Sequence, residues 1–347
     1  MKCLKIFENT ILLTFLCTIV SAQKSLDSIE DFAYEAIKWI VEGVAELTGQ
    51  PVNRSDVTFY LKTSKDDNST NHFIDPENPT QMALAKGKIY FFIHGWTQSR
   101  ESTPWYSPLT ETLLKRYSDA FIVQVDWSRP AGENYPFASF TTERIGIIIG
   151  DFIFKVVKDY RIPFTNVIII GHSLGAHVSS WTCKRFYELS GLKLPRLIAL
   201  DPAGPLFLTR PKDRRLNAND AQYVTVVHTD ITIFGYPTDI GTLDFYPNSG
   251  MNQPGCKLDW TNSTSLTKDL FCSHTRAFEF FLHAVRNPQF FMAKRCPSYE
   301  DFKNEKCDNI EVSLGDLETT QRGDFFLDTD AQPPYFHTSE QNATRAN

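Results

Sequence analysis

The stretch Asn166 to His177, NVIIIGHSLGAH, constrains the fold more than any other part of the sequence. Its β-branched run, Val167 to Ile170, predicts a buried strand that ends at Gly171, and a helical pattern begins at Gly175. Ser173 lies between the two glycines. In the simpler interpretation this serine caps the helix. In the other, the turn is bent sharply so that the hydroxyl is presented above the sheet as a nucleophile.

Strand and helix patterns alternate along the chain, which favours an α/β fold with a mainly parallel central sheet and helices on both faces. The expected strands are 88–96, 120–127, 166–171, 197–201 and 223–230, and the expected helices are 144–160, 175–189 and 275–287. Residues 51–86 are polar and rich in turn residues, so they suit loops and short edge strands. We expect one domain over residues 23–335, followed by a polar tail over residues 336–347.

The N-terminus has the composition of a secretory signal peptide. Lys2 and Lys5 precede the apolar run Ile11 to Val20, and small residues up to Ala22 form a cleavage site. A membrane span needs about 20 apolar residues, roughly twice the length of this run. We therefore expect residues 1–22 to be removed and the protein to be secreted to the extracellular space.

Secretion permits disulfides and glycosylation. Pairing between sequence neighbours predicts the disulfides Cys256–Cys272 and Cys296–Cys307 and leaves Cys183 as a free, buried thiol. No histidine ligand set accompanies these cysteines, which argues against zinc. The glycosylation sequons are at Asn53, Asn68, Asn262 and Asn342. The net charge of −6, with no basic block, argues against nucleic acid as a partner.

A nucleophilic serine needs a base, and the base needs an acid that orients it. In the chain order Ser, acid, His, the acid is either Asp201, after the strand LIAL, or Asp230, at the end of YVTVVHTD. His274 is the best-placed base, because a disulfide would hold its loop just before a helix. Three other histidines follow the serine but fit less well, in an apolar strand, in mid-helix and in the polar tail: His228, His283 and His337.

The oxyanion that forms during acyl transfer needs two backbone N–H donors. We expect one from Leu174, directly after the nucleophile, and the other from Trp96, in the turn after the strand FFI. Gly95 would let that turn approach the site.

Six segments resemble one family. GHSLGAH, ALDPAGPLF, VVHTD, IGTLDFYPNSGMNQPGC, CSHTRAFEFF and FFLDTD resemble, in order, the animal pancreatic-type lipase family, from about residue 85 to residue 330. Within that family the chain resembles most closely the secreted phospholipase A1 branch and its insect relatives. The resemblance implies an α/β-hydrolase fold, hydrolysis of lipid carboxylic esters at interfaces without a cofactor, and the triad Ser173, Asp201 and His274. The resemblance is also what selects Asp201 over Asp230.

The chain departs from the family's pattern in three places. It ends where the family's lipases continue into a C-terminal β-sandwich, so we expect neither that domain nor a protein partner for it. Lys257 to Phe271 corresponds to the family's lid and is shorter than in triglyceride lipases; it is either a lid that contacts lipid or an ordinary surface loop. The family's calcium loop is degenerate, and we expect no metal there: Lys212 and Asn217 replace acids, and Arg215 and Asp220 remain.

We expect peripheral contact with a lipid–water interface and a phospholipid or glyceride substrate. The short lid and the missing domain favour phospholipase A1 activity. The alternatives are a triglyceride lipase with the same triad, a non-catalytic lipid-binding member like the insect yolk proteins, and an esterase for soluble esters.

Overall fold

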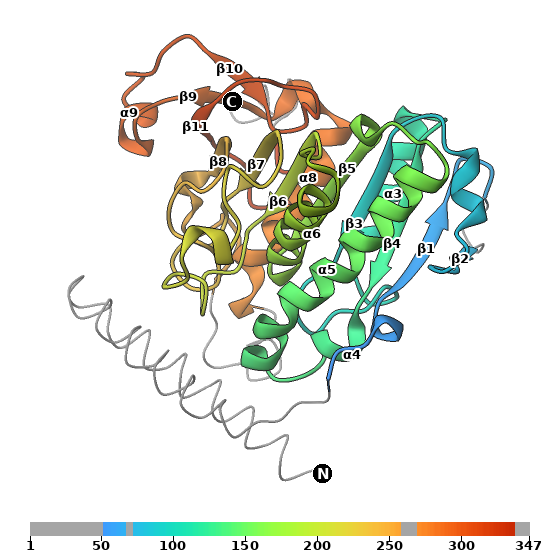
Figure 1. The fold of residues 1–347 in the computed structure, drawn as a ribbon. Helices are drawn as coiled ribbons and strands as arrows, with labels where there is room; N and C mark the ends of the chain where they lie inside the picture. The colour runs from blue at the N-terminus through green and yellow to red at the C-terminus, as the bar shows by residue number, and fades with distance from the viewer. Residues whose placement is uncertain (1–50, 67–71, 258–268, 337–347) are drawn as a thin grey trace.

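The structure is a computed structural model that describes residues 51–66, 72–257 and 269–336. These residues form an eleven-stranded sheet in the order β10-β9-β11-β8-β7-β6-β5-β3-β4-β1-β2 (Figure 1). Neighbouring strands from β4 across to β11 are parallel, and the strands at both edges are antiparallel. The strands are β1 (Thr58–Lys62), β2 (His72–Ile74), β3 (Ile89–Ile93), β4 (Phe121–Asp126), β5 (Val167–His172), β6 (Arg196–Leu200), β7 (Tyr223–Val227), β8 (Leu243–Pro247), β9 (Met292–Arg295), β10 (Glu311–Ser313) and β11 (Gly323–Leu327).

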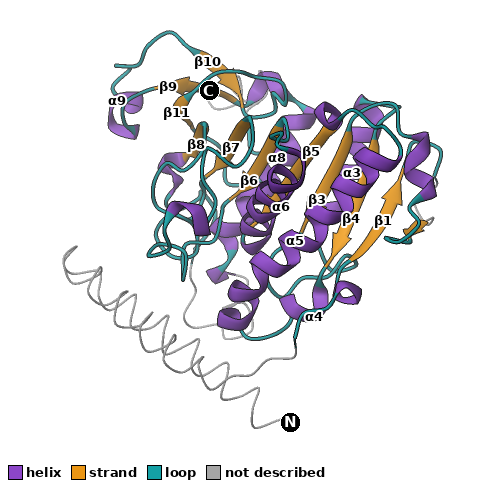
Figure 2. Ribbon diagram, viewed as in Figure 1, coloured by secondary structure: helices purple, strands orange, loops and turns teal. Residues whose placement is uncertain are grey.

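Helices cover both faces of this sheet (Figure 2). The helices are α3 (Tyr106–Arg116), α4 (Ser128–Ala131), α5 (Tyr135–Asp159), α6 (Leu174–Ser190), α8 (Cys272–Arg286) and α9 (Tyr299–Lys303). Buried residues of α5 and α6 share one hydrophobic core with the sheet, and those of α3 and α8 share a second core on the opposite face. The central strands therefore lie between two helical layers.

Alternate residues of the central strands divide between these two cores. In β3, Phe91 and Ile93 join the core beneath α5 and α6, whereas Tyr90 and Phe92 join the core beneath α3 and α8. Successive side chains of a strand point to opposite faces, so a strand covered on both sides is apolar throughout. Burial of one Phe or Ile side chain stabilises the fold by about 1.5–3 kcal/mol. This is why unbroken apolar runs in the sequence mark these strands.

The predicted fold class is confirmed, because the sheet is mainly parallel and carries helices on both faces, as in α/β hydrolases. Several boundaries differ from the prediction. Helix α8 begins at Cys272 and not at residue 275, so the placement of His274 in a loop before that helix was wrong. Helix α5 begins at Tyr135, well before residue 144, because the Asn134 side chain accepts the N–H of Phe137 at 3.0 Å and Pro136 suits the first turn. Strand β7 ends at Val227, so the placement of His228 inside a strand was wrong.

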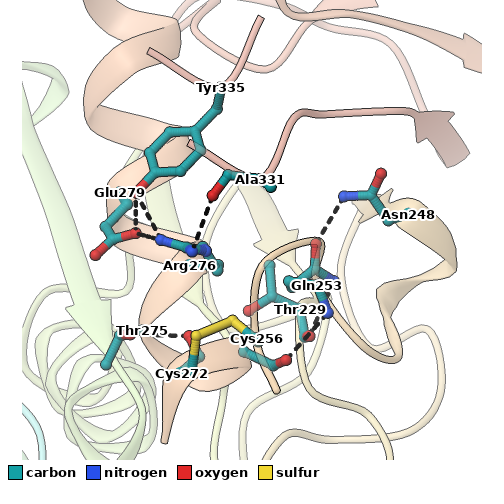
Figure 3. Close-up of a disulfide and its surroundings, with 11 residues drawn as sticks. Thr229, Asn248, Gln253, Cys256, Cys272, Thr275, Arg276, Glu279, Ala331 and Tyr335 are labelled. Carbon is teal, nitrogen blue, oxygen red and sulfur yellow. Dashed lines mark hydrogen bonds and ion pairs between the residues drawn. A yellow bond between two sulfur atoms is a disulfide. The ribbon is translucent and has the colours of Figure 1, made fainter. Parts of the chain in front are cut away.

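Both predicted disulfides are present. The Cα atoms are 5.5 Å apart in Cys256–Cys272 and 4.5 Å apart in Cys296–Cys307. Figure 3 shows the first bond at the start of α8, so it fixes the end of the helix that carries His274. Cys183 lies on α6 as a buried free thiol, and burial raises the pKa of that thiol.

The end of the described chain packs back onto α8. Arg276 Nη1 donates to the Tyr335 hydroxyl at 2.6 Å, and that hydroxyl donates to Glu279 Oε2 at 2.5 Å (Figure 3). The predicted signal peptide, residues 1–22, and residues 337–347 of the predicted tail lie outside the described residues. Within the described ranges, no helix combines the length and apolar character needed to cross a bilayer.

Candidate active site

Ser173 occupies the turn between β5 and α6 with φ 58° and ψ −123°. A non-glycine residue in this region is strained and persists only where the surrounding structure enforces it. Here the Ser173 N–H donates to the Leu200 carbonyl of β6 at 3.0 Å, which ties the turn to the next strand. The Ser173 side chain makes no capping hydrogen bond to α6. The turn has the strained backbone expected of a nucleophile elbow, and the helix-capping interpretation is wrong.

The two glycines of the elbow let three elements approach closely. A Cβ atom on Gly175 would lie 2.2 Å from the carbonyl oxygen of Ile93 on β3, and a Cβ on Gly171 would lie 2.3 Å from the carbonyl oxygen of Gly175. Both distances are far below van der Waals contact. Glycine at these positions allows α6 to begin directly against β3 and β5, and this packing enforces the strained conformation of Ser173.

His274 and Asp201 meet beside this turn. His274 lies in the first turn of α8, and its Nδ1 is 2.6 Å from Asp201 Oδ2. Asp201 follows β6 and is fully buried, and its Oδ1 also accepts the N–H groups of Thr229 at 2.8 Å and Asp230 at 3.2 Å. The structure thus brings together the acid and the base that the sequence predicts, and the acid's orientation is set by the loop after β7.

Asp230, the alternative acid, lies in the same cluster, but its pKa and its hydrogen bonding differ from those of an ordinary aspartate. Ligand atoms of Asp201, Asp230 and His274 lie within 4.8 Å of one another, a grouping that also occurs at metal sites. Burial, together with the charge of Asp201, raises the pKa of Asp230 well above its usual value and so favours the neutral form of this carboxyl. Its Oδ2 finds no hydrogen-bond partner in the described part of the chain. Asp201 already accepts hydrogen bonds at both carboxylate oxygens, so the cluster offers a cation few free ligand atoms.

The two residues predicted as oxyanion donors, Trp96 and Leu174, lie next to Ser173. A Cβ on Gly95 would lie 3.0 Å from Ser173 Cβ, so the turn after β3 abuts the serine. Gly95 N–H donates to Gln98 Oε1 at 2.9 Å and Thr97 N–H donates to the Ala131 carbonyl at 2.8 Å, and Trp96 lies between these two bonded amides. Leu174 is the first residue of α6, where backbone N–H groups have no partner within the helix.

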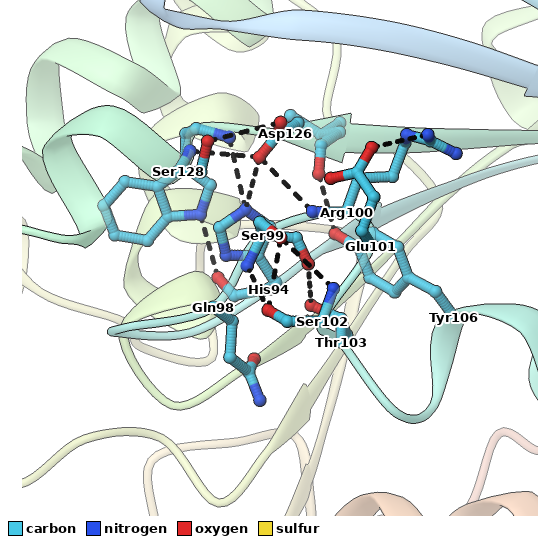
Figure 4. Close-up of polar contacts among 12 residues, drawn as sticks. His94, Gln98, Ser99, Arg100, Glu101, Ser102, Thr103, Tyr106, Asp126 and Ser128 are labelled. Carbon is cyan, nitrogen blue, oxygen red and sulfur yellow. Dashed lines mark hydrogen bonds and ion pairs between the residues drawn. The ribbon is translucent and has the colours of Figure 1, made fainter.

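A buried histidine anchors this turn to the neighbouring loop (Figure 4). His94 Nδ1 lies 2.9 Å from the Gly95 carbonyl oxygen, and its Nε2 lies 3.2 Å from Asp126 Oδ1. Trp127 Nε1 donates to the His94 carbonyl at 2.9 Å. Burial opposes ionisation of Asp126, but hydrogen bonds from His94 and Ser128 outweigh it and lower the pKa of this carboxyl. The turn that carries Trp96 is thereby held by the loop after β4.

His172 contacts His274, the predicted base. Its Nε2 donates to the carbonyl oxygen of His274 at 3.1 Å, and the two rings lie 4.7 Å apart. Burial and the neighbouring His274 lower the pKa of His172 well below its usual value, so the ring stays neutral. In the predicted chain order Ser, acid, His, His172 cannot be the base, because it precedes Ser173. No sequence pattern indicates this contact, because the two residues are far apart in the chain.

An apolar wall lies next to the base. The rings of Phe234 and Phe271 stack with centroids 4.3 Å apart, and the Phe234 centroid lies 5.8 Å from that of His274. Phe271 ends the predicted lid, and residues 258–268 of that segment lie outside the described residues. Leu270, at the same end of the segment, is 9% exposed.

The remaining predicted residues lie away from this cluster or outside the described chain. His228 pairs with Asp244, its Nε2 being 2.8 Å from Oδ1, and His283 packs against Tyr335. Among the sequons, Asn53 is exposed. Outside the described residues lie Asn68, Asn262, His337 and Asn342.

Comparison with known proteins assigns the family. A family model described as Lipase matches residues 33–335. The chain belongs to the lipase family. This lipase-family chain is 33% identical to lipase member H of Rattus norvegicus over 264 residues, which are 73% of this chain and 56% of that protein. It is 34% identical to phospholipase A1 of Vespa velutina over 213 residues, which are 59% of this chain and 67% of that protein.

The chain spans about half the length of lipase member H, at 56%. Among solved structures, esterase 2 of Thermogutta terrifontis, phosphonylated by sarin, gives a TM-score of 0.34 at 13% identity, over 52% of this chain and 70% of that one.

Proposed function

We propose that this protein is a secreted lipid carboxylic ester hydrolase of the phospholipase A1 type that uses Ser173, His274 and Asp201. The observation that carries the proposal is the 2.6 Å contact between His274 and Asp201 beside a serine held in a strained turn. The family and the names of two relatives, lipase member H and phospholipase A1, support ester hydrolysis of lipids. We further propose that residues 1–22 are the secretion signal and that residues 23–335 form one domain.

In the first half-reaction, Ser173 Oγ attacks the ester carbonyl carbon and its proton passes to His274 Nε2. Asp201 accepts the Nδ1–H and stabilises the imidazolium that forms. The negative charge on the former carbonyl oxygen is stabilised by the N–H groups of Trp96 and Leu174. His274 then gives the proton to the leaving alcohol oxygen as the carbon–oxygen bond breaks, and the acyl group remains on Ser173.

In the second half-reaction, water attacks the acyl carbon. His274 takes a proton from the water, and then returns it to Ser173 Oγ as the acyl–enzyme bond breaks. The fatty acid leaves and the enzyme is restored. With a phospholipid cleaved at its first glycerol position, the products are one fatty acid and one lysophospholipid.

The apolar wall of Phe234 and Phe271 suits an acyl chain next to the base. Binding of the chain against these rings would remove apolar surface of both from water. We propose that Lys257 to Phe271 acts as the lid and contacts the lipid surface. A triglyceride lipase with the same triad is the second candidate, since one relative carries the name lipase member H.

The deciding experiment is a product assay on a phospholipid with different acyl chains at its two glycerol positions, run beside a triglyceride. We expect release of the first-position chain. Release from the triglyceride alone would favour the second candidate. The Ser173→Ala variant should be secreted but inactive. It should also fail to react with a fluorophosphonate that labels the wild type, and an unlabelled wild-type protein would contradict the enzyme proposal.

A further inference from the structure

A lysine from the helix of the nucleophile fills the centre of loop 210–220. Lys184, on α6, places its Nζ 2.6 Å from Asp220 Oδ1, 2.6 Å from Ser180 Oγ and 3.0 Å from the Arg215 carbonyl oxygen. An ammonium group has three N–H donors and no acceptor. Each donor of Lys184 therefore has one oxygen partner. Loop 210–220 follows Asp201 in the chain and corresponds to the family's calcium loop, in which we expect no metal because acidic residues are replaced.

The oxygens of this loop do not fit a calcium ion. Calcium takes six to eight oxygen ligands, usually including several carboxylates. Here the one buried carboxylate, Asp220, already accepts hydrogens at both oxygens: Asn217 Nδ2 donates to Oδ1 at 2.9 Å and Asn217 N–H donates to Oδ2 at 3.0 Å. The Arg215 carbonyl oxygen accepts Asn217 Nδ2 at 3.3 Å as well as Lys184. Both Asp220 oxygens and the Arg215 carbonyl oxygen therefore already face N–H donors.

We propose that the Lys184 ammonium is the resident cation of loop 210–220, so that the loop is folded without a metal ion. Its charge balances Asp220, and its three hydrogen bonds join α6 to two points of the loop. This inference concerns the fold of the loop and goes beyond the proposed hydrolase function.

The pair is buried enough for this charge balance to matter. The Asp220 side chain is 2% exposed and that of Lys184 is 17% exposed. Burial raises the pKa of Asp220, and the adjacent ammonium opposes that rise. Without Lys184 the carboxylate would be left in the interior with two N–H donors from Asn217 and no opposite charge. Removing one partner of a buried ion pair is far more destabilising than removing both.

The loop also contacts the segment that follows the catalytic acid. Leu216 N–H donates to His177 Nδ1 at 3.3 Å, and His177 Nε2 donates to the Ala203 carbonyl at 2.8 Å. Burial lowers the pKa of His177 to about 3, so the ring is neutral and keeps this donor and acceptor arrangement at physiological pH. Lys184 thus fixes one end of a series of contacts that reaches two residues from Asp201.

The test is thermal unfolding of the full secreted chain. The wild-type melting temperature should be the same in EDTA and in millimolar calcium. The Lys184→Met variant, which keeps the length of the side chain and removes its charge, should melt about 5–10 °C lower. Calcium-dependent stabilisation of the wild type, or a Lys184→Met variant as stable as the wild type, would overturn the inference.

Two further variants make the result specific. Lys184→Met/Asp220→Asn removes both charges and should melt higher than Lys184→Met alone. Lys155→Met is the matched control, because Lys155 pairs with Asp159 at 3.0 Å on the surface, with side chains 38% and 42% exposed, and it should change the melting temperature little. If Lys184→Met is not recovered as folded protein, recovery of the double variant supports the inference. If neither variant is recovered as folded protein, the wild-type melting temperatures in EDTA and in calcium decide whether the inference holds. These readouts do not depend on ester hydrolysis, so either proposal can fail alone.

Discussion

Two aspartates, Asp201 and Asp230, lie close to His274, and their surroundings differ in the hydrogen bonds that they offer to the carboxyl group. Asp201 accepts three hydrogen bonds, from the N–H groups of Thr229 and Asp230 and from His274 Nδ1. The Asp230 side chain is buried, has a raised pKa and has no partner for Oδ2 within the described ranges. Where titratable groups share a site, such differences assign their roles. These contacts support our proposal that Asp201, and not Asp230, orients the base.

This assignment predicts opposite outcomes for two matched substitutions. Asp201→Asn places an amide against His274 Nδ1 and favours the wrong tautomer, so kcat on a soluble monomeric ester should fall roughly 10³- to 10⁴-fold. Asp230→Asn replaces a neutral carboxyl by a neutral amide of the same size, and kcat should stay close to the wild-type value. Melting curves check that both variants are folded. A larger loss for Asp230→Asn than for Asp201→Asn would make Asp230 the acid.

At the scale of elements, the sequence predicts best what is buried on both faces. β3, β5 and β6 each contain an apolar run of at least four residues and were predicted, and so was α6. Helix α3 was not predicted, because it has no side-chain cap and Pro108 lies in its first turn. Strand β8 was not predicted, because Asp244 interrupts its pattern. That carboxylate is buried only because His228 and the backbone of the preceding turn bond to it.

The triad residues could be predicted from the sequence, whereas the contacts that support them could not. Ser173 is predictable because strand, serine and helix follow one another in the chain, and the choice of Asp201 depended on family resemblance. His172–His274 and His94–Asp126 had no signal, because each pair joins residues from different elements. Such contacts depend on which strands become neighbours in the sheet, and the order β5-β3-β4 is not the order of the chain.

The turn after β3 offers a test at this scale. In Gly95→Ala, the added Cβ would lie 3.0 Å from Ser173 Cβ and 3.2 Å from the His172 carbonyl oxygen, so the turn must shift away from the nucleophile by a few tenths of an ångström. Complete loss of one oxyanion donor lowers kcat about 10²- to 10³-fold. We expect a smaller loss, of about 10-fold or more, with a nearly unchanged melting temperature.

Gly191→Ala is the control for this substitution. Gly191 ends α6 with φ 70°, and an added Cβ would meet no atom within 4 Å. Alanine there is strained by its backbone conformation alone and should lower stability by about 1 kcal/mol while leaving kcat unchanged. Equal kcat values for the two alanine variants would remove the turn after β3 from the oxyanion site.

At the scale of the whole molecule, one edge of the sheet assembles the site. The carboxyl ends of parallel β3, β5, β6 and β7 meet at this edge. The residues that follow these strands are the turn with Gly95 and Trp96, then Ser173, Asp201 and the loop that bonds to Asp201. Ligand sites of open parallel sheets occur at this edge because the loops there converge. α8 then delivers His274 to the same edge, held by the Cys256–Cys272 bond.

Two neighbouring carboxyl groups on β8 and β11 of the same sheet make the stability of the protein depend on pH. Asp324 on β11 lies directly opposite Asp244 on β8. Burial, together with Asp244 and Asp239, raises the pKa of Asp324 from 3.8 to about 6, although His228 acts in the opposite direction. Between these values the unfolded chain is ionised at this position while the folded chain still holds the proton. Stability therefore falls as pH rises from about 4 to about 6 and stays lower above that range.

Asp324→Asn removes this titration. Relative to the wild type, its free energy of unfolding should therefore rise from pH 4 to pH 6, and the difference should persist at pH 7–8. Urea unfolding at a series of pH values measures it. Asp308→Asn should behave in the opposite way: desolvation opposes ionisation of Asp308, but the hydrogen bond from Arg295 outweighs it and lowers the pKa. That contribution exists above the usual aspartate pKa and is lost on acidification, so the Asp308 variant should be the less stable one at neutral pH. A wild type and an Asp324→Asn variant with parallel pH profiles would contradict a raised pKa at Asp324.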